Sequence, residues 1–387
     1  MRVFGKWVLR IFVVFVLAVV VVGLWQREKI TRLLAVNSLF SEEKIVNNFS
    51  HMDAAFLTTP VGRGNGATAE LVYGADATLP VDVAPWIVAR DVTALVVLKD
   101  GEIVHESYYK GTAPEDLRIS WSVAKSYLSA LVGVLLAEGT IASIDDPVVK
   151  YAPALEGGAY DGASIRNVLN MASGVTFNED YLDQSSDINR MGRVLALGGS
   201  MDNFAASLAE TFGPAGAQWQ YVSIDTHVLS MVVRGAAKQP IAELLSEKII
   251  IPMGLEREPY YLTDGYGTAF VLGGLNLTTR DYARMGQMFL QYGQYNGTQI
   301  VPQDWVVAST TPSAPTAAGE IGYGYQWWIP QGAVEGEFMA RGIYGQYVYI
   351  NRARGVVIAT NAADRNFRAQ GVSEQNISIF REIANNI

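Results

Sequence analysis

The chain has 387 residues, enough for one large domain or two closely packed domains with an extensive core. Half of the residues are hydrophobic and 17% are charged, a balance that favours a globular protein with a membrane element over a disordered chain. The net charge of −9 argues against nucleic acid as a main partner. Because the chain has no cysteine and only three histidines, disulfides and thiol catalysis are excluded, and we predict neither a metal centre nor a cofactor.

The N-terminal segment is strongly apolar and begins with basic residues. Trp7 to Trp25 can span a bilayer if the Arg10 side chain extends to the interface. No small-residue cleavage site follows this run. Residues 1–30 therefore predict an uncleaved signal-anchor in the inner membrane, with the rest of the chain outside the cytoplasm. A cleaved signal peptide is the alternative, and it leaves the rest of the chain on the same side.

The rest of the chain carries strand and helix patterns in a definite order. Residues 31–89 are mixed in character and predict a stalk and an N-terminal wrap. The segments Val92–Lys99 and Glu102–Tyr109 flank an Asp100-Gly101 turn and predict a β-hairpin. Helices are then expected from the Ser122 turn to Glu138, over 165–171 and over 226–236, and a helix capped at Thr278 is expected through Leu290. Strands are expected over 344–350 and 355–361, and a last helix over 373–383. This order predicts an α+β domain over 90–387, in which strands from both ends share one antiparallel sheet flanked by helices, with an inserted, mostly helical region.

The start of the first of these helices carries a candidate catalytic pair. Ser122 and Lys125 are three residues apart at its first turn, so they share a face. The dipole of a helix N-terminus favours developing negative charge, and burial lowers the pKa of a lysine, so the pair suits a serine nucleophile with a lysine base. Chance produces about one such pair in a chain of this length. Ser41 and Lys44 form a second pair in a charged stretch, and spacing alone leaves both readings of Ser122 open.

Two further features are candidate parts of a site. The polar loop 178–187, which contains Tyr181, has no regular period, and long irregular loops often line binding sites. Tyr221 lies at a loop-to-helix junction from which its side chain could reach a cleft, although a half-buried tyrosine with a satisfied hydroxyl is the commoner outcome. The paired carboxylates Asp145 and Asp146 are interpreted as helix caps rather than as an acid–base pair.

Several short motifs follow one another in a characteristic order. They are Ser122-Val123-Ala124-Lys125, Asp146-Pro147 through Pro153, Tyr221-Val222-Ser223, Pro252-Met253-Gly254-Leu255, Gly273-Gly274 with Arg280-Asp281 and Arg284-Met285-Gly286, and Tyr323-Gly324-Tyr325-Gln326-Trp327-Trp328. Each motif is weak by itself. Together they resemble the serine β-lactamase and penicillin-binding-protein superfamily, in particular its β-lactamase-related esterase and amidase branch, over about residues 90–385.

The resemblance implies a role for each matched residue. Ser122 would be the nucleophile, Lys125 its base, and Tyr221 the group that passes a proton to the leaving group and then activates water. Backbone N–H groups of Ser122 and of a strand at 343–346 would stabilise the oxyanion, and losing one such donor typically costs about 3–4 kcal/mol. The substrate would contact Ile343, Tyr344, Gln346, Tyr181 and Ser223.

Two departures from the family pattern concern the substrate. The second box ends in Ser223 where asparagine is usual. The third box, Lys-Thr-Gly in penicillin-recognising members, reads Ile343-Tyr344-Gly345, so the cation that would pair with a substrate carboxylate is missing. Such a charged contact is worth about 1.5–3 kcal/mol. We therefore expect a small ester or amide rather than a β-lactam or a peptidoglycan end.

The sequence thus predicts a membrane-anchored serine hydrolase that acts through an acyl-enzyme on Ser122. Two alternatives stay open. One is a β-lactamase or D-alanyl-D-alanine peptidase with the same chemistry, which labelling by penicillin would favour. The other is a non-catalytic binding or sensor domain of the same fold, against which the intact set of Ser122, Lys125 and Tyr221 argues.

Overall fold

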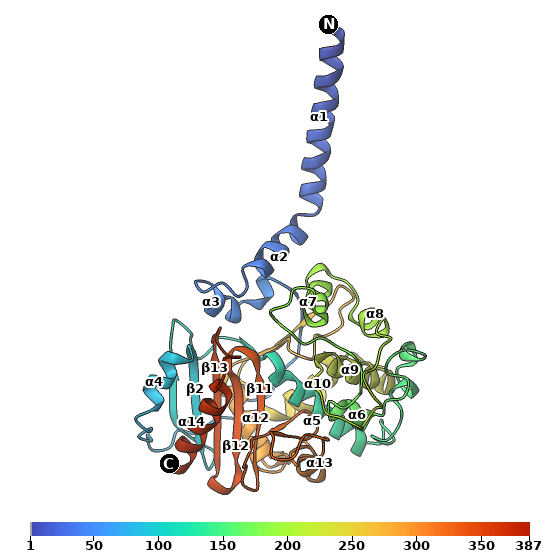
Figure 1. Cartoon of the computed structure of the whole chain (residues 1–387). Coiled ribbons are helices and arrows are strands. Elements are labelled where there is room, and N and C mark those ends of the chain that lie inside the picture. Colours follow the sequence, from blue (N-terminus) through green and yellow to red (C-terminus); the bar gives the residue numbers. More distant parts are fainter. Residues whose placement is uncertain (1) are drawn as a thin grey trace.

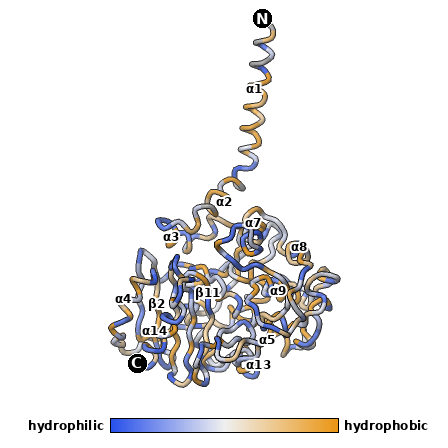
Figure 2. Tube along the Cα trace, viewed as in Figure 1, coloured by the Kyte–Doolittle hydropathy of each residue, from blue (hydrophilic) through white to orange (hydrophobic). Residues whose placement is uncertain are grey.

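A long N-terminal helix leads into an α+β body in the computed structural model, which describes residues 2–387 (Figure 1). This helix, α1 (Arg2–Trp25), extends away from the body and is mostly hydrophobic along its length (Figure 2). Within residues 2–387 no single helix is long and apolar enough to cross a membrane. The stretches Arg10–Trp25 and Ile30–Val36, bent by 64°, meet the length and composition only as a pair. Membrane anchoring therefore stays a prediction.

The segment after α1 wraps onto the body. Helix α2 (Arg27–Asn37) is followed by α3 (Ile45–Ser50). Helix α3 lies within residues 31–89, which were expected to form the stalk and wrap, whereas α2 begins four residues before them. Phe49 and Met52 are fully buried in the main core. The wrap is thus packed into the body rather than merely linked to it.

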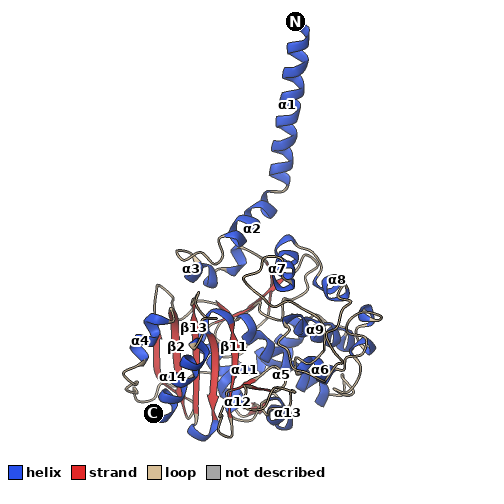
Figure 3. Ribbon diagram, viewed as in Figure 1, coloured by secondary structure: helices blue, strands red, loops and turns tan. Residues whose placement is uncertain are grey.

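The centre of the body is an antiparallel sheet whose strands come from both ends of the chain (Figure 3). In the described part of the chain its seven strands run in the order β3-β2-β13-β12-β11-β10-β9. Their bounds are β2 Val92–Lys99, β3 Glu102–Tyr108, β9 Gly322–Tyr323, β10 Trp328–Ile329, β11 Glu337–Gly342, β12 Gln346–Asn351 and β13 Val356–Ala362. Strand β2 pairs with both β3 and β13, which confirms the predicted hairpin and the predicted sharing of one sheet.

Both faces of this sheet are covered. Strand β2 is apolar almost throughout, as expected for a strand that is buried on two sides. Val97 packs in a cluster with the C-terminal helix α14 (Val372–Asn386), whereas its neighbour Val96 joins the main core on the face of α12 (Thr279–Leu290). The Thr278 hydroxyl caps α12 by accepting from the Asp281 N–H, as the sequence predicts.

The region between the two halves of the sheet is mainly helical, as predicted. Besides α12, its helices are α5 Ala124–Ala137, α6 Ile165–Leu169, α7 Asp187–Leu197, α8 Met201–Ala206, α9 Ser223–Ala237, α10 Ile241–Leu245, α11 Ile251–Met253 and α13 Gln303–Ser309; α4 (Val83–Ala89) precedes the sheet. A smaller sheet has the order β1-β5-β6-β4, and β7 pairs with β8. These strands are β1 Leu57–Pro60, β4 Arg118–Ile119, β5 Tyr260–Thr263, β6 Leu275–Leu277, β7 Gln294–Tyr295 and β8 Thr298–Gln299.

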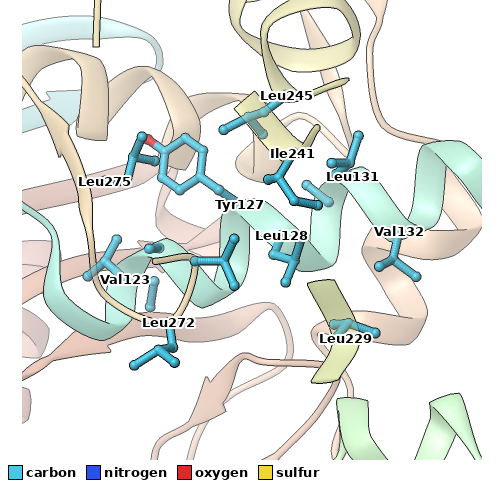
Figure 4. Close-up of a cluster of buried hydrophobic side chains, with 14 of the residues drawn as sticks. Val123, Tyr127, Leu128, Leu131, Val132, Leu229, Ile241, Leu245, Leu272 and Leu275 are labelled. Carbon is cyan, nitrogen blue, oxygen red and sulfur yellow. The ribbon is translucent and has the colours of Figure 1, made fainter. Parts of the chain in front are cut away.

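Helix α5 runs through the middle of the main core. Every residue from Ala124 to Leu135 is buried. Figure 4 shows its side chains Leu128 and Leu131 beside Leu229 of α9 and Ile241 of α10. Burying one leucine fully contributes roughly 1.5–3 kcal/mol, so the helix is held firmly at the point where it carries the candidate catalytic pair.

Two local predictions are wrong. Tyr344, expected in a strand, lies in the 3₁₀ turn Ile343–Gly345 with a left-handed φ of 61°, and β12 begins only at Gln346. Asp145 and Asp146 do not cap a helix but form ion pairs with Arg166 and Lys150. The position of Tyr344 depends on a sharp turn and the contact of Asp145 on a partner 21 residues away, and the local pattern reveals neither. Lys150 is only four residues from Asp146.

Candidate active site

Ser122 lies in a sharp turn between the small sheet and the central helix. It is the middle residue of a 3₁₀ turn, Trp121–Val123, that follows β4 and leads directly into α5. Trp121 has a left-handed φ of 43°, which costs a non-glycine residue about 1–2 kcal/mol. Unfavourable backbone of this kind concentrates at functional sites, where the surrounding packing holds it in place.

Ser122 lines a cavity of about 740 Å³. Tyr221 and Trp328 also line it, as do the end of β11, the loops 179–181 and 367–371, and Ser373 and Glu374 in the first turn of α14. The polar loop containing Tyr181 therefore forms part of the cavity wall, where the sequence predicts it. The volume is that of a pocket for a small molecule.

Lys125 is buried beside Ser122. Its Nζ donates hydrogen bonds to Ser122 Oγ (2.8 Å), to the Leu272 carbonyl oxygen (2.9 Å) and to Ser223 Oγ (3.3 Å). Burial lowers the pKa of Lys125 to about 7, although the Glu179 carboxylate acts in the opposite direction. A large share of such a lysine is neutral at neutral pH and can accept a proton from Ser122.

The other Ser-x-x-Lys pair has a different environment. Ser41 Oγ donates to the backbone carbonyl of Ser38, and Lys44 lies on the surface. Ser41 does not line the cavity that contains Ser122. The structure therefore separates the two pairs that spacing alone could not distinguish.

Glu179 joins the polar loop to this network. Its carboxylate accepts from the Ser223 N–H (3.1 Å), from the Ser223 hydroxyl and from the Tyr181 hydroxyl (2.7 Å). Because Ser223 also accepts from Lys125, a carboxylate lies one hydrogen-bonded residue away from the lysine. The sequence predicts this loop in the cavity wall but does not predict a role for Glu179.

Tyr221 lies beside Ser122 and Lys125. Its ring stacks on Trp328 at a centroid distance of 5.2 Å, and Lys125 Nζ lies 5.2 Å from the ring centroid. Burial and the Glu179 charge raise the pKa of Tyr221, more than hydrogen bonding to the hydroxyls of Ser122 and Ser223 lowers it. The resting phenol is therefore protonated.

The end of β11 approaches Ser122 through Gly342. A Cβ atom on Gly342 would lie 2.7 Å from the Ser120 carbonyl oxygen and 3.1 Å from the Ser122 nitrogen, so only glycine allows this approach. Ile343, the next residue, lines the cavity. The backbone expected to supply a second oxyanion donor therefore lies close to Ser122, in a turn rather than in a strand.

Three predicted contact residues lie outside the cavity lining. Ser223 is buried within the Lys125 and Glu179 network. Tyr344 packs among aromatic rings, against Phe40. The Gln346 carboxamide donates to the backbone carbonyls of Ile343 (3.3 Å) and Ala362 (2.8 Å), which fits a residue that shapes the turn.

The cavity contains a cation that the sequence does not predict. Arg341 lines the cavity, lies 5.4 Å from the Trp328 ring and donates to the Ser373 hydroxyl at 2.9 Å. The expectation of a missing cation assumed that Gly345 is the glycine beside the nucleophile. The glycine that lies against Ser122 is instead Gly342, and Arg341 directly precedes it.

The histidines take no part in this site. His105 contacts the Ser107 hydroxyl on its own strand, and buried His227 pairs with Asp202 on α8. His51, which follows α3, contacts the Asn47 carbonyl oxygen of that helix. Across residues 2–387, no group of three or more histidine, aspartate or glutamate side chains is arranged to hold a metal ion.

Comparisons with known proteins agree with this geometry. The β-lactamase family model matches residues 87–376. The 6-aminohexanoate-dimer hydrolase of Paenarthrobacter ureafaciens is 32% identical over 327 residues, which are 80% of this chain and 83% of that protein.

Solved structures share the fold. A Bacillus anthracis protein named as a candidate 6-aminohexanoate-dimer hydrolase has a TM-score of 0.79 at 23% identity, covering 90% of this chain and 95% of that one. A D-stereospecific amidohydrolase from Streptomyces has a TM-score of 0.55 at 18% identity, covering 74% of this chain and 98% of that one.

Proposed function

Because this chain belongs to the β-lactamase family and is a serine hydrolase of that fold, we propose that it cleaves a small amide or ester through an acyl-enzyme on Ser122. One observation carries the proposal. Lys125 Nζ lies 2.8 Å from Ser122 Oγ, and burial lowers the lysine pKa to about 7. An amine of this kind can take the serine proton at neutral pH, which an exposed lysine does poorly. The relative that acts on 6-aminohexanoate dimers favours an amide.

Acylation uses three side chains. Ser122 Oγ attacks the carbonyl carbon of the substrate while its proton moves to neutral Lys125. The tetrahedral intermediate then collapses as Tyr221 donates its proton to the leaving nitrogen or oxygen. Lys125 returns the proton it took up to Tyr221, so the enzyme ends this step with a neutral lysine and a protonated phenol.

Deacylation reverses the same transfers with water in place of the leaving group. A water molecule attacks the acyl carbon and gives a proton to Tyr221, which passes its own proton to Lys125. Lys125 then protonates Ser122 Oγ as the acid product leaves. In both steps the oxyanion receives hydrogen bonds from the backbone N–H groups of Ser122 and Ile343, which Gly342 brings together.

Labelling and turnover test this assignment. The body without residues 1–30 is treated with a fluorophosphonate probe as wild type, Ser122→Ala and Ser41→Ala. We expect labelling to be lost only in Ser122→Ala, because Ser41 lies outside the cavity. Labelling that survives Ser122→Ala would overturn the assignment, and the Ser41→Ala variant controls for reaction at the other Ser-x-x-Lys pair.

A β-lactamase or D-alanyl-D-alanine peptidase activity is the second candidate, favoured by Arg341. Its guanidinium lines the cavity on the strand that ends at Gly342 and can pair with a substrate carboxylate. Nitrocefin turnover, or labelling by a fluorescent penicillin, that is lost in Arg341→Gln would support this candidate. Turnover of a small amide without either reaction would leave the amidase as the activity.

We also propose that residues 1–30 anchor the body to the inner membrane, with the catalytic body outside the cytoplasm. Support comes from the exposed apolar side chains along α1, which leads away from the body (Figure 2). A topology reporter fused after Ile387 should be active only if it is exported. Activity of a reporter that functions only in the cytoplasm would contradict this orientation.

A further inference from the structure

The catalytic turn is backed by aromatic rings from the N-terminal wrap. Phe40 stacks on Tyr344 at 5.0 Å with an interplanar angle of 13° and lies 5.8 Å from Trp121. Phe49, at the end of α3, meets the same two rings edge-on at 5.4 Å and 5.6 Å. Two rings of the wrap therefore contact both Trp121 and Tyr344, which are far apart in the sequence.

Trp121 and Tyr344 have the same unusual backbone conformation. Both are non-glycine residues with left-handed φ angles, 43° and 61°. Each is adjacent in sequence to one proposed oxyanion donor, Trp121 to Ser122 and Tyr344 to Ile343. Such conformations are unfavourable for L-residues and persist only when the surroundings hold the side chain in place. The aromatic contacts supply that restraint at both positions.

The wrap itself is tied to the strand before the nucleophile. The buried Arg118 guanidinium on β4 donates to the Val46 carbonyl oxygen at 2.8 Å and to Ser50 Oγ at 2.6 Å. Phe49 is fully buried between these two anchor points. Phe40 and Phe49 lie before residue 87, where the match to the family model begins, so this part of the wrap lies outside the matched domain.

We propose that Phe40 and Phe49 are positioning residues that hold the backbone N–H groups of Ser122 and Ile343 in the geometry that stabilises the oxyanion. They act through Trp121 and Tyr344 and do not touch the substrate. This inference rests on the proposed function. Without the ring of Phe40, Tyr344 and Trp121 lose packing on one side. The turns at 121–123 and 343–345 then relax, and the backbone N–H groups of Ser122 and Ile343 no longer point at the same oxyanion.

The expected effect is on the rate constant and not on substrate binding. Complete loss of one oxyanion donor lowers kcat about 10²–10³-fold. We expect Phe40→Ala to lower kcat at least about 10-fold with little change in KM, because the donors are misaligned rather than removed. Phe40→Tyr retains the ring stack and should restore most of kcat. Phe49→Leu, which keeps apolar bulk in the core but loses the edge-on contacts, should lower kcat in the same direction.

The test uses the full chain in detergent, with kcat and KM for a p-nitrophenyl ester and the melting temperature for each variant. Phe212→Ala is the matched control, since Phe212 is 40% exposed, Phe40 is 38% exposed, and Phe212 lies outside the cavity lining. A Phe40→Ala enzyme with unchanged kcat, a change in KM alone, or a loss that Phe40→Tyr fails to restore would overturn the inference.

Failure of this inference is distinguishable from failure of the proposed function. If wild-type turnover is abolished by Ser122→Ala but is insensitive to Phe40→Ala, the nucleophile stands and only the positioning role is wrong. If turnover survives Ser122→Ala, the proposed function itself is wrong. Binding of a boronic acid, which forms a tetrahedral adduct with a serine, should weaken in Phe40→Ala but not in Phe212→Ala.

Discussion

The pH dependence of the reaction should follow the protonation of Lys125. Only the neutral amine can take the Ser122 proton, and burial lowers the lysine pKa to about 7. As the pH falls below that value the ammonium form predominates, so kcat/KM should decline. With a pKa of about 7, roughly a tenth of the lysine is neutral at about pH 6 and roughly nine tenths at about pH 8. The ratio of kcat/KM at these two pH values should therefore be nearly tenfold.

Replacing Glu179 provides a second test of Lys125 as the base. Its negative charge favours the ammonium form of Lys125 and so raises the lysine pKa. In Glu179→Gln the pKa of Lys125 should fall, and the acid limb should move to lower pH. A fall of one pKa unit, about 1.4 kcal/mol, would raise the neutral fraction at about pH 6 from roughly a tenth to roughly half. Activity at that pH, relative to activity at about pH 8, should then rise about fivefold.

The assay is ester hydrolysis followed by pH-stat from about pH 5 to about pH 9. Glu374→Gln is the control, because Glu374 also lines the cavity but does not contribute to the Lys125 pKa shift. A profile without an inflection near neutrality would refute Lys125 as the base. A midpoint that moves to higher pH in Glu179→Gln would refute the electrostatic reasoning.

Three further substitutions have defined outcomes. Tyr221→Phe keeps the stack on Trp328 but removes the proton relay, so steady-state ester turnover should fall about 10²–10⁴-fold. Gly342→Ala places a Cβ atom 2.7 Å from the Ser120 carbonyl oxygen, so this backbone must shift: kcat should fall by roughly 10²-fold, and the melting temperature should fall as well. Gly133→Ala places a Cβ atom 2.2 Å from Cγ of Trp305 in the core, so denaturant unfolding should show a loss of about 1–3 kcal/mol.

Each of these predictions has a contrary outcome. Normal turnover in Tyr221→Phe would remove the tyrosine from the mechanism. An unchanged kcat in Gly342→Ala would mean that the end of β11 does not position an oxyanion donor. For the core substitution the control is Gly192→Ala in α7, where a Cβ atom has open space and should be neutral or slightly stabilising. Equal losses in the two alanine variants would contradict the packing argument.

Local patterns in the sequence predicted the elements that local physics decides. The Asp100-Gly101 turn between two apolar runs became the hairpin of β2 and β3, and Thr278 became the cap of α12. Both features depend on residues within a few positions of one another. Helix α7 was not predicted, although Ser186 is a suitable N-cap and the apolar residues after it have helical spacing. The polar residues of the preceding loop obscured this pattern.

The sequence by itself also determined that Ser122 and Lys125 share a face, because they are three residues apart where the helix begins. In the structure Lys125 Nζ lies 2.8 Å from Ser122 Oγ. Only the tertiary structure decided what surrounds them. Glu179, Arg341 and Gly342 line the same cavity as Ser122 but come from a loop and a strand far along the chain. Their positions follow from how β11 enters the sheet and how the loop packs on Ser223 at the start of α9. The low pKa of Lys125 does not follow from its spacing either, because it results from the burial of α5 in the core. Lys44 has the same spacing from a serine but lies on the surface.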